Sequence, residues 1–238
     1  MSLVVTKGYL LARYDYAIFD EVLVFLNQFG NRFTCLALGT RKITSKNARA
    51  LLYGNYLEIE LFYTHSNEKM SKLKKVVAIN QIGFNYASNL ALITVGDVIS
   101  KLPNTNKMWF DFYQDILVKV LMDYDKYQIS VYVYLVFIKV VFRNVKFQQC
   151  SKHLCQNWQE LKLGFSFYNS TLVCTECSPQ IKQLTSFEIQ LLLTLNKFSL
   201  QDLDFFNKTY NINWKSFYLK LHYSFNEYRK KINQLYKK

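Results

Sequence analysis

The stretch LEIEL, residues 57–61, sets the fold of the N-terminal part of the chain. Leu57, Ile59 and Leu61 alternate with Glu58 and Glu60, and successive side chains of a β-strand point to opposite faces. A strand with this pattern buries its leucine and isoleucine side chains and exposes its glutamates to water. We therefore predict a half-buried strand that covers an apolar core.

Four further apolar runs, rich in β-branched and aromatic residues, lie near this strand at residues 4–12, 18–26, 33–38 and 73–79. Polar residues around Gly30 separate the second run from the third, and a glycine that can adopt positive φ is typical of a hairpin turn. Five short strands of this kind favour a small closed barrel.

After about residue 81 the apolar spacing becomes helical, at three or four residues. The clearest helix is predicted at 214–235, and residues 185–188 (TSFE) form a capping box that begins another. The pattern at 131–147 fits either a strand or a buried helix. We predict an α+β protein with a five-stranded barrel domain at residues 1–80, packed on a helical domain at 81–238.

The chain is basic, with 30 Lys and Arg against 17 Asp and Glu and a net charge of +13. Half of its residues are hydrophobic, which excludes a disordered tail. The longest apolar run, residues 129–142, is shorter than the roughly 20 residues that a membrane-spanning helix needs. The opening residues lack the pattern of a secretion signal. The net charge favours an anionic partner, such as a nucleic acid or a membrane face, and charge alone does not choose between them. We expect a cytoplasmic protein, with a nucleic acid and no membrane as its partner.

A basic loop is predicted after Gly39, within a span between Glu21 and Glu58 that contains no acidic residue. Lysine and arginine in a loop can follow a phosphate backbone without reading bases. Such residues also occur in loops that are merely solvated, but the length of the acid-free span favours nucleic-acid binding. The candidate phosphate contacts are Arg41, Lys42, Lys46 and Arg49.

Four of the five cysteines cluster in the second half of the chain. Cys174 and Cys177 form a C-x2-C motif, and Cys150, His153 and Cys155 precede it. Zinc favours four soft ligands in a tetrahedron, which two such motifs can supply, with either Cys155 or His153 as the fourth ligand. Thiolates that fill all four positions leave none for water, so we expect one structural Zn²⁺ per chain. Reduced cysteines without metal are the alternative.

Motifs of common enzymes do not occur in the sequence. It contains no Gly-rich phosphate loop, no G-x-S-x-G and no H-E-x-x-H, and it has only three histidines. We therefore expect a protein that binds its partners without covalent chemistry.

Several short motifs occur in a characteristic order: Lys7-Gly8, Phe19-Asp20-Glu21-Val22, Phe29-Gly30 and Leu38-Gly39-Thr40-Arg41-Lys42. Together with the cysteine motifs, the helix start at 184–188 and the last helix, they resemble the RecO family of bacterial DNA repair proteins over essentially the whole chain. The composition, rich in aromatic residues, Lys, Asn and Ile, suggests an AT-rich bacterium such as a mollicute.

The resemblance implies an OB-fold barrel and a helical domain with a zinc-binding insertion at about 148–180. Proteins of this family are recombination mediators that act at the nucleoid. They bind single- and double-stranded DNA, anneal complementary strands, contact the acidic tail of single-stranded DNA-binding protein, and with RecR help to load RecA. An RNA-binding or ribosome-associated OB-fold module is the alternative that the charge and barrel allow.

The resemblance also assigns residues. It places the loop after Gly39 on the nucleic-acid face of the barrel, with Lys7, Arg13 and Arg32 as secondary candidates for DNA contact. Lys139 and Arg143 are candidates for the rim of a pocket for the acidic tail, although two charges that reach solvent from a buried helix explain them equally well.

Overall fold

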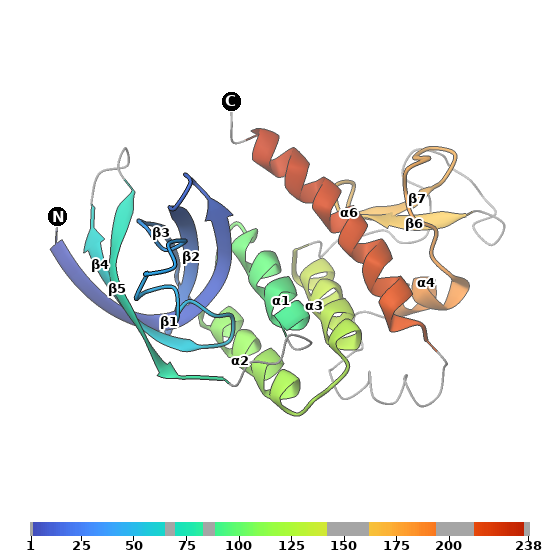
Figure 1. Ribbon diagram of the computed structural model, residues 1–238. Helices are drawn as coiled ribbons and strands as arrows, with labels where there is room; N and C mark the ends of the chain where they lie inside the picture. The colour runs from blue at the N-terminus through green and yellow to red at the C-terminus, as the bar shows by residue number, and fades with distance from the viewer. Residues whose placement is uncertain (1, 65–69, 83–88, 142–161, 194–211, 236–238) are drawn as a thin grey trace. The chain divides into compact units, whose positions relative to one another are not determined.

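The computed structural model describes residues 2–64, 70–82, 89–141, 162–193 and 212–235 (Figure 1). The chain divides into two compact units, Met1–Lys126 and Tyr127–Lys238. The first unit contains a barrel and two helices, so the expected domain boundary near residue 80 falls inside it.

The barrel consists of β1 (Ser2–Asp15), β2 (Glu21–Asn27), β3 (Arg32–Ala37), β4 (Tyr56–Tyr63) and β5 (Ser71–Asn80). The strand order is β1-β2-β3-β5-β4, and β4 pairs with β1 to close the barrel. All neighbours are antiparallel except β3 and β5, which run parallel. The five predicted strands are confirmed, and the closed five-stranded arrangement is OB-fold-like.

The alternating pattern of β4 gives the expected burial. Leu57, Ile59 and Leu61 lie in the barrel core, while Glu58 and Glu60 are half-buried on the outer face. The second strand begins later than predicted, because residues 16–20 form a turn. In this turn the backbone N–H groups of Tyr16 and Ala17 both donate to the carbonyl oxygen of Asp20.

Two helices, α1 (Asn89–Ser100) and α2 (Lys107–Leu121), complete the first unit. The backbone of α1 lies directly on β1, since a Cβ atom added to Gly96 would lie 2.2 Å from the carbonyl oxygen of Leu11. The β2–β3 turn approaches the start of α2 as closely, at Gly30, where φ is +82°. These backbone contacts attach the helices to the barrel and move the boundary of the unit to Lys126.

The second unit contains α3 (Lys126–Val141), a hairpin of β6 (Leu163–Ser166) and β7 (Thr171–Cys174), α4 (Ser186–Leu193) and α6 (Trp214–Leu235). The ambiguous segment that begins at residue 131 is helical as far as Val141. Aromatic rings fill the core of this unit, with Tyr134, Phe137, Phe167 and Phe225 all buried.

Hydrogen bonds fix the starts of two helices in the second unit. The predicted capping box of α4 is confirmed, because Thr185 N donates to Glu188 Oε2 at 2.7 Å and Glu188 N donates to Thr185 Oγ1 at 3.2 Å. At the start of α6, Ser216 N donates to Asn213 Oδ1 at 3.0 Å. Within the described ranges, none of the helices combines the length and the apolar character needed to cross a bilayer.

Candidate nucleic-acid interface

The first part of the β3–β4 loop, residues 38–42, is held against the β1–β2 turn. Gly39 N donates to Asp20 Oδ1 at 2.7 Å, and Arg41 N donates to the carbonyl oxygen of Phe19 at 3.1 Å. The buried hydroxyl of Thr40 donates to Glu21 Oε2 at 2.8 Å. These bonds hold the loop backbone in a defined position on the barrel.

The later part of the loop is held against β5 instead. Val76 N, in β5, donates to Asn47 Oδ1 at 3.1 Å. Ala50 and Leu51 are buried in the barrel core, and Asn55 Nδ2 donates to the carbonyl oxygen of Ala50 at 3.1 Å. The loop therefore presents its cations at two places, one beside the β1–β2 turn and one beside β5.

An open groove of about 690 Å³ is lined by residues of the later part of the loop and of β5. Lys46 and Arg49 from the loop and Lys74 and Lys75 from β5 contribute the cations, and aliphatic residues around Val76 contribute apolar surface. We call this the basic groove. The residues that line it are Lys46, Asn47, Arg49, Ala50, Lys74, Lys75, Val76, Val77, Ala78 and Gln81.

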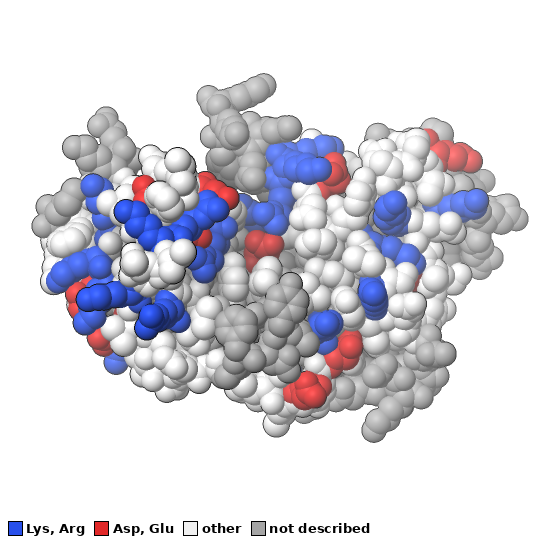
Figure 2. Space-filling view, in the orientation of Figure 1, with Lys and Arg blue, Asp and Glu red and all other residues white. Residues whose placement is uncertain are grey.

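A β-bulge brings two adjacent lysines of β5 to the surface. Leu73 pairs with Leu61 and Lys75 pairs with Glu60, so Lys74 is an extra residue without a partner in β4. Lys74 and Lys75 are both exposed, although regular alternation would turn one of them inward. Figure 2 shows Lys and Arg side chains gathered on the face of the barrel unit that it displays, with Asp and Glu among them.

The prediction from sequence did not include the β5 lysines. A signal was present: the run Lys72-Leu73-Lys74-Lys75 begins a second acid-free span, between Glu68 and Asp97. The basic groove thus combines side chains from the two long acid-free segments of the barrel unit.

Few acidic groups oppose the cations of the basic groove. Lys74 Nζ lies 3.1 Å from Glu60 Oε2. Among the residues that the structure describes, Lys46, Arg49 and Lys75 form no ion pair within 4.0 Å. Their charges are available to an anionic ligand.

Arg41 and Lys42 lie away from this groove, beside the β1–β2 turn. Arg41 Nη1 lies 3.2 Å from Asp15 Oδ1 in an exposed ion pair, which water screens. Lys42 Nζ lies 5.5 Å from the centre of the Phe19 ring. Lys7 is exposed on β1, opposite Glu58 of β4. The structure therefore divides the four predicted loop cations into two pairs, Arg41 with Lys42 and Lys46 with Arg49.

Arg13 binds groups of the barrel itself. Its Nε and Nη2 donate to the two carboxylate oxygens of Glu21 at 2.9 and 2.7 Å, and its Nη1 donates to the carbonyl oxygen of Leu51 at 3.1 Å. Burial raises the pKa of Glu21, but hydrogen bonds from Arg13 and Thr40 outweigh it, so that the pKa is lowered overall. This buried network joins β1 and β2 to both ends of the basic loop.

Arg32 holds the end of α1. Its Nη1 donates to the carbonyl oxygens of Ile99 and Ser100 in the last turn of α1 and of Leu102 just after the helix. Its backbone N–H donates to Thr105 Oγ1 at 3.1 Å. Arg13 and Arg32 thus use their donors to stabilise the fold, and we leave them out of the proposed DNA-binding surface.

Part of the predicted zinc site lies in the described chain. Cys174 ends β7 and is buried, and Cys177 N donates to Cys174 Sγ at 3.4 Å. A sulfur that accepts a backbone N–H suits a metal-bound thiolate, so the C-x2-C turn fits two ligands. In the described ranges no group of three or more Cys, His, Asp and Glu could hold a metal. Cys150, His153 and Cys155 lie outside those ranges.

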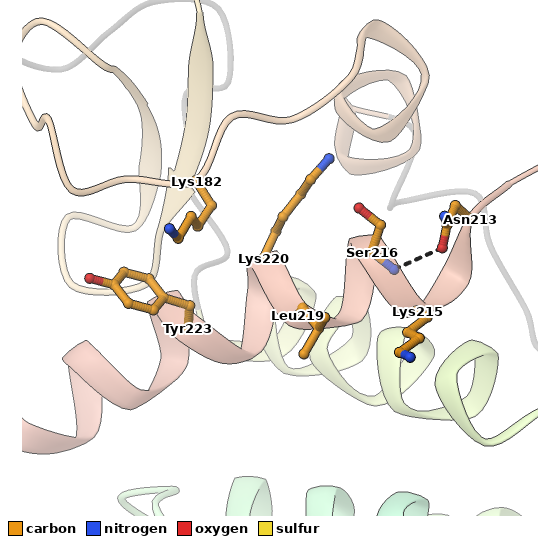
Figure 3. Close-up of a pocket in the computed structure, with 7 residues that line it drawn as sticks. All are labelled: Lys182, Asn213, Lys215, Ser216, Leu219, Lys220 and Tyr223. Atoms are coloured by element: carbon orange, nitrogen blue, oxygen red, sulfur yellow. Dashed lines mark hydrogen bonds between the residues drawn. The ribbon is translucent and has the colours of Figure 1, made fainter.

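The second unit has a pocket of about 470 Å³ along the start of α6 (Figure 3). Leu219 and Tyr223 give it apolar surface, and Lys182 Nζ lies 5.3 Å from the centre of the Tyr223 ring. Lys215 and Lys220 add charge, although Lys220 Nζ is paired with the buried Glu188 at 2.7 Å.

One of the two residues predicted for a tail-binding rim lies in the described part of the chain, away from the lining of this pocket. Lys139 is exposed near the end of α3 and does not line the pocket, and Arg143 lies outside the described residues.

Comparison with known proteins finds similarity to two DNA repair proteins named RecO. The chain is 23% identical over 180 residues to RecO of Mycoplasma mycoides subsp. mycoides SC, which covers 72% of this chain and 70% of that protein. It is 22% identical over 178 residues to RecO of Mycoplasma capricolum subsp. capricolum, with the same coverage. No family model matches the sequence. These two similarities support a RecO-like family.

Proposed function

We propose that this protein is a DNA repair and recombination mediator of the RecO type, which binds single- and double-stranded DNA without sequence specificity. The observation that carries the proposal is the basic groove, where Lys46, Arg49, Lys74 and Lys75 converge on an OB-fold-like barrel. The similarity to two proteins named RecO supports the same function.

The groove explains binding and annealing by one physical effect. Lysine and arginine neutralise phosphates and release the counterions that surround them, which drives binding and makes it sensitive to salt. Two complementary strands repel each other until their charge is screened. A protein that neutralises phosphates and leaves base edges free lowers this repulsion, so that the strands can pair. The reaction requires no covalent step.

Further partners follow from the proposal. With RecR, the protein helps to load RecA onto DNA covered by single-stranded DNA-binding protein, in the cytoplasm at the nucleoid. We assign the acidic tail of single-stranded DNA-binding protein to the pocket of α6, because Leu219 and Tyr223 offer apolar surface between Lys182 and Lys215. This assignment replaces the rim expected at Lys139 and Arg143.

We also propose one structural zinc ion in the second unit. Cys174 and Cys177 would hold it together with Cys150 and either Cys155 or His153. The ion would join the end of β7 to the preceding part of the chain and so stabilise the unit.

Strand annealing tests the proposed function. Complementary oligonucleotides coated with the cognate single-stranded DNA-binding protein should anneal faster when the protein is added, and the acceleration should fall as salt rises. The variant Lys46→Ala/Arg49→Ala should anneal more slowly, whereas Lys107→Ala/Lys119→Ala on α2, with the same change in charge, should behave like the wild type.

Two outcomes would contradict the proposal. Preference for a structured RNA over single-stranded DNA in a competition experiment would favour the RNA-binding alternative. Cleavage of labelled DNA in the presence of magnesium or manganese would show that the protein is an enzyme.

A further inference from the structure

An exposed phenylalanine lies on the outer face of the barrel, beside the basic groove. Phe62 is the seventh residue of β4 and pairs with Leu3 of β1 on one side and with Lys72 of β5 on the other. Directly paired residues of neighbouring strands place their side chains on the same face of a sheet. Phe62 is 40% exposed and Leu3 is 53% exposed, so this row presents apolar surface to solvent next to a lysine.

Lys74 connects this row of residues to the basic groove. This residue lines the groove, and its Nζ lies 5.9 Å from the centre of the Phe62 ring. The bulge at Lys74 therefore gives the β5 side of the groove a cation that also reaches the aromatic ring. Glu60, on the same face of β4, is paired with Lys74 at 3.1 Å and adds no unpaired negative charge.

Charge on this face selects the kind of ligand. Lys72, Lys74 and Lys75 stand along one strand, and Lys46 and Arg49 face the last two of them across the groove. A polyanion is attracted along this line of cations, and the aromatic ring lies at one end of it. An unpaired nucleic-acid strand has both of the groups that such a surface binds, phosphates and the flat faces of its bases.

We propose that Phe62 is a base-stacking residue through which the barrel distinguishes unpaired DNA from duplex DNA. The proposal rests on the DNA-binding function proposed above and adds a selectivity to it. Bases in a duplex are stacked on one another and have no free flat face along the helix, so a duplex binds this surface through its phosphates. A single strand can also place a base on the ring, and one such contact should strengthen binding about tenfold.

The proposal is tested on the full chain with Phe62→Leu, which removes the ring but keeps an apolar side chain on the strand. Three fluorescent ligands are compared by anisotropy: a 20-nucleotide thymidine strand, a strand of the same length made of abasic sites, and a blunt duplex. Phe29→Leu is the control, because Phe29 is 64% exposed on the β2–β3 turn and does not line the groove.

The wild type should bind the thymidine strand about tenfold more tightly than the abasic strand, since one stacked base accounts for such a ratio. Phe62→Leu should abolish this preference without changing affinity for the duplex, and Phe62→Trp should retain it. Phe29→Leu should behave like the wild type.

Other results overturn the inference in distinguishable ways. An unchanged preference in Phe62→Leu, or an equal loss of affinity for all three ligands, would show that the ring does not stack on bases. If Phe62→Leu keeps the preference for the thymidine strand but no longer binds a protein partner of the wild type, this face binds protein and not bases. If the wild type binds none of the three ligands, the proposed DNA-binding function itself fails.

Discussion

Asn47 Oδ1 accepts a hydrogen bond from the backbone N–H of Val76 at 3.1 Å and so attaches the basic loop to β5. Both residues line the basic groove, so the bond joins its loop side to its β5 side. The distance between the loop cations and the β5 cations therefore depends on the uncharged side chain of Asn47.

Replacing Asn47 by alanine should loosen the groove. The variant leaves Val76 N–H without this acceptor and should lower the free energy of unfolding by about 1 kcal/mol, measured by urea denaturation. It should also weaken DNA binding, although the charge is unchanged. Stability and affinity equal to those of the wild type would show that the loop does not need this bond.

Removal of three groove cations should weaken DNA binding uniformly across sequences. For Lys46→Ala/Arg49→Ala/Lys75→Ala, we expect the slope of log affinity against log salt to fall by about 0.9 for each duplex phosphate that the variant no longer neutralises. The slope is measured by titration at several salt concentrations. Arg41→Ala/Lys42→Ala should have a smaller effect, since those residues lie beside the β1–β2 turn. Equal salt slopes for triple variant and wild type would exclude the groove.

The pair of Arg13 and Glu21 should make the barrel sensitive to acid. Because the pKa of Glu21 is lowered in the folded protein, its contribution to stability is present above the ordinary value of 4.5 and is lost as pH falls through the folded pKa. Thermal unfolding should therefore show a steeper loss of stability below pH 4.5 in the wild type than in Glu21→Gln. Parallel pH profiles for the two proteins would contradict this assignment.

Metal analysis should find about one zinc ion per chain, as two short ligand motifs imply. Cys174→Ser should reduce the zinc content and destabilise the second unit more than the barrel. Cys35→Ala is the matched control, because burial raises the pKa of that thiol to about 12 and leaves it protonated at neutral pH. Zinc-free protein prepared without chelator would contradict the metal site.

Gly96→Ala tests the contact between α1 and β1, because the variant is less stable than the wild type if the contact is close and more stable if it is not. Alanine in a helix is favoured over glycine by about 1 kcal/mol, so an uncrowded site would gain stability. A Cβ atom at 2.2 Å from the Leu11 carbonyl oxygen must displace the helix, and we expect a loss of about 1–3 kcal/mol in chemical denaturation. A stabilised variant would show that the helix and strand are further apart.

Periodicity predicted the secondary structure of the barrel, because adjacent residues such as Ile59 and Glu60 lie on opposite faces of one strand and differ in polarity accordingly. It did not find the attachment of α1, since the close approach at Gly96 depends on the absence of a side chain, which leaves no periodic signal. The exposed lysine pair of β5 was missed for a related reason. A bulge is set by register with the neighbouring strand, and one sequence does not contain that register.

Counting charges drew attention to the basic loop but could not show which of the predicted cations bond to the protein's own groups. Arg13 and Arg32 have the same composition signal as Arg49, yet they bond to carbonyl oxygens 38 and 67 or more residues away in the sequence. These partners are backbone carbonyl oxygens, and every residue has one, so the sequence does not show which of them accept a hydrogen bond from an arginine. Only the folded arrangement shows which guanidinium groups are already used.

The parallel ladder between β3 and β5 is the shortest in the barrel. It contains only the pairs Cys35 with Ser71 and Leu36 with Lys72, whereas each other pair of neighbouring strands shares at least six. Separation of these two strands breaks the fewest hydrogen bonds, so this seam is where the cylinder opens at the lowest free-energy cost. Lys72 belongs to both the seam and the row of Phe62. A polyanion that contacts Lys72 and also reaches β3 would bridge this seam, favour the closed barrel and so make the whole domain more rigid.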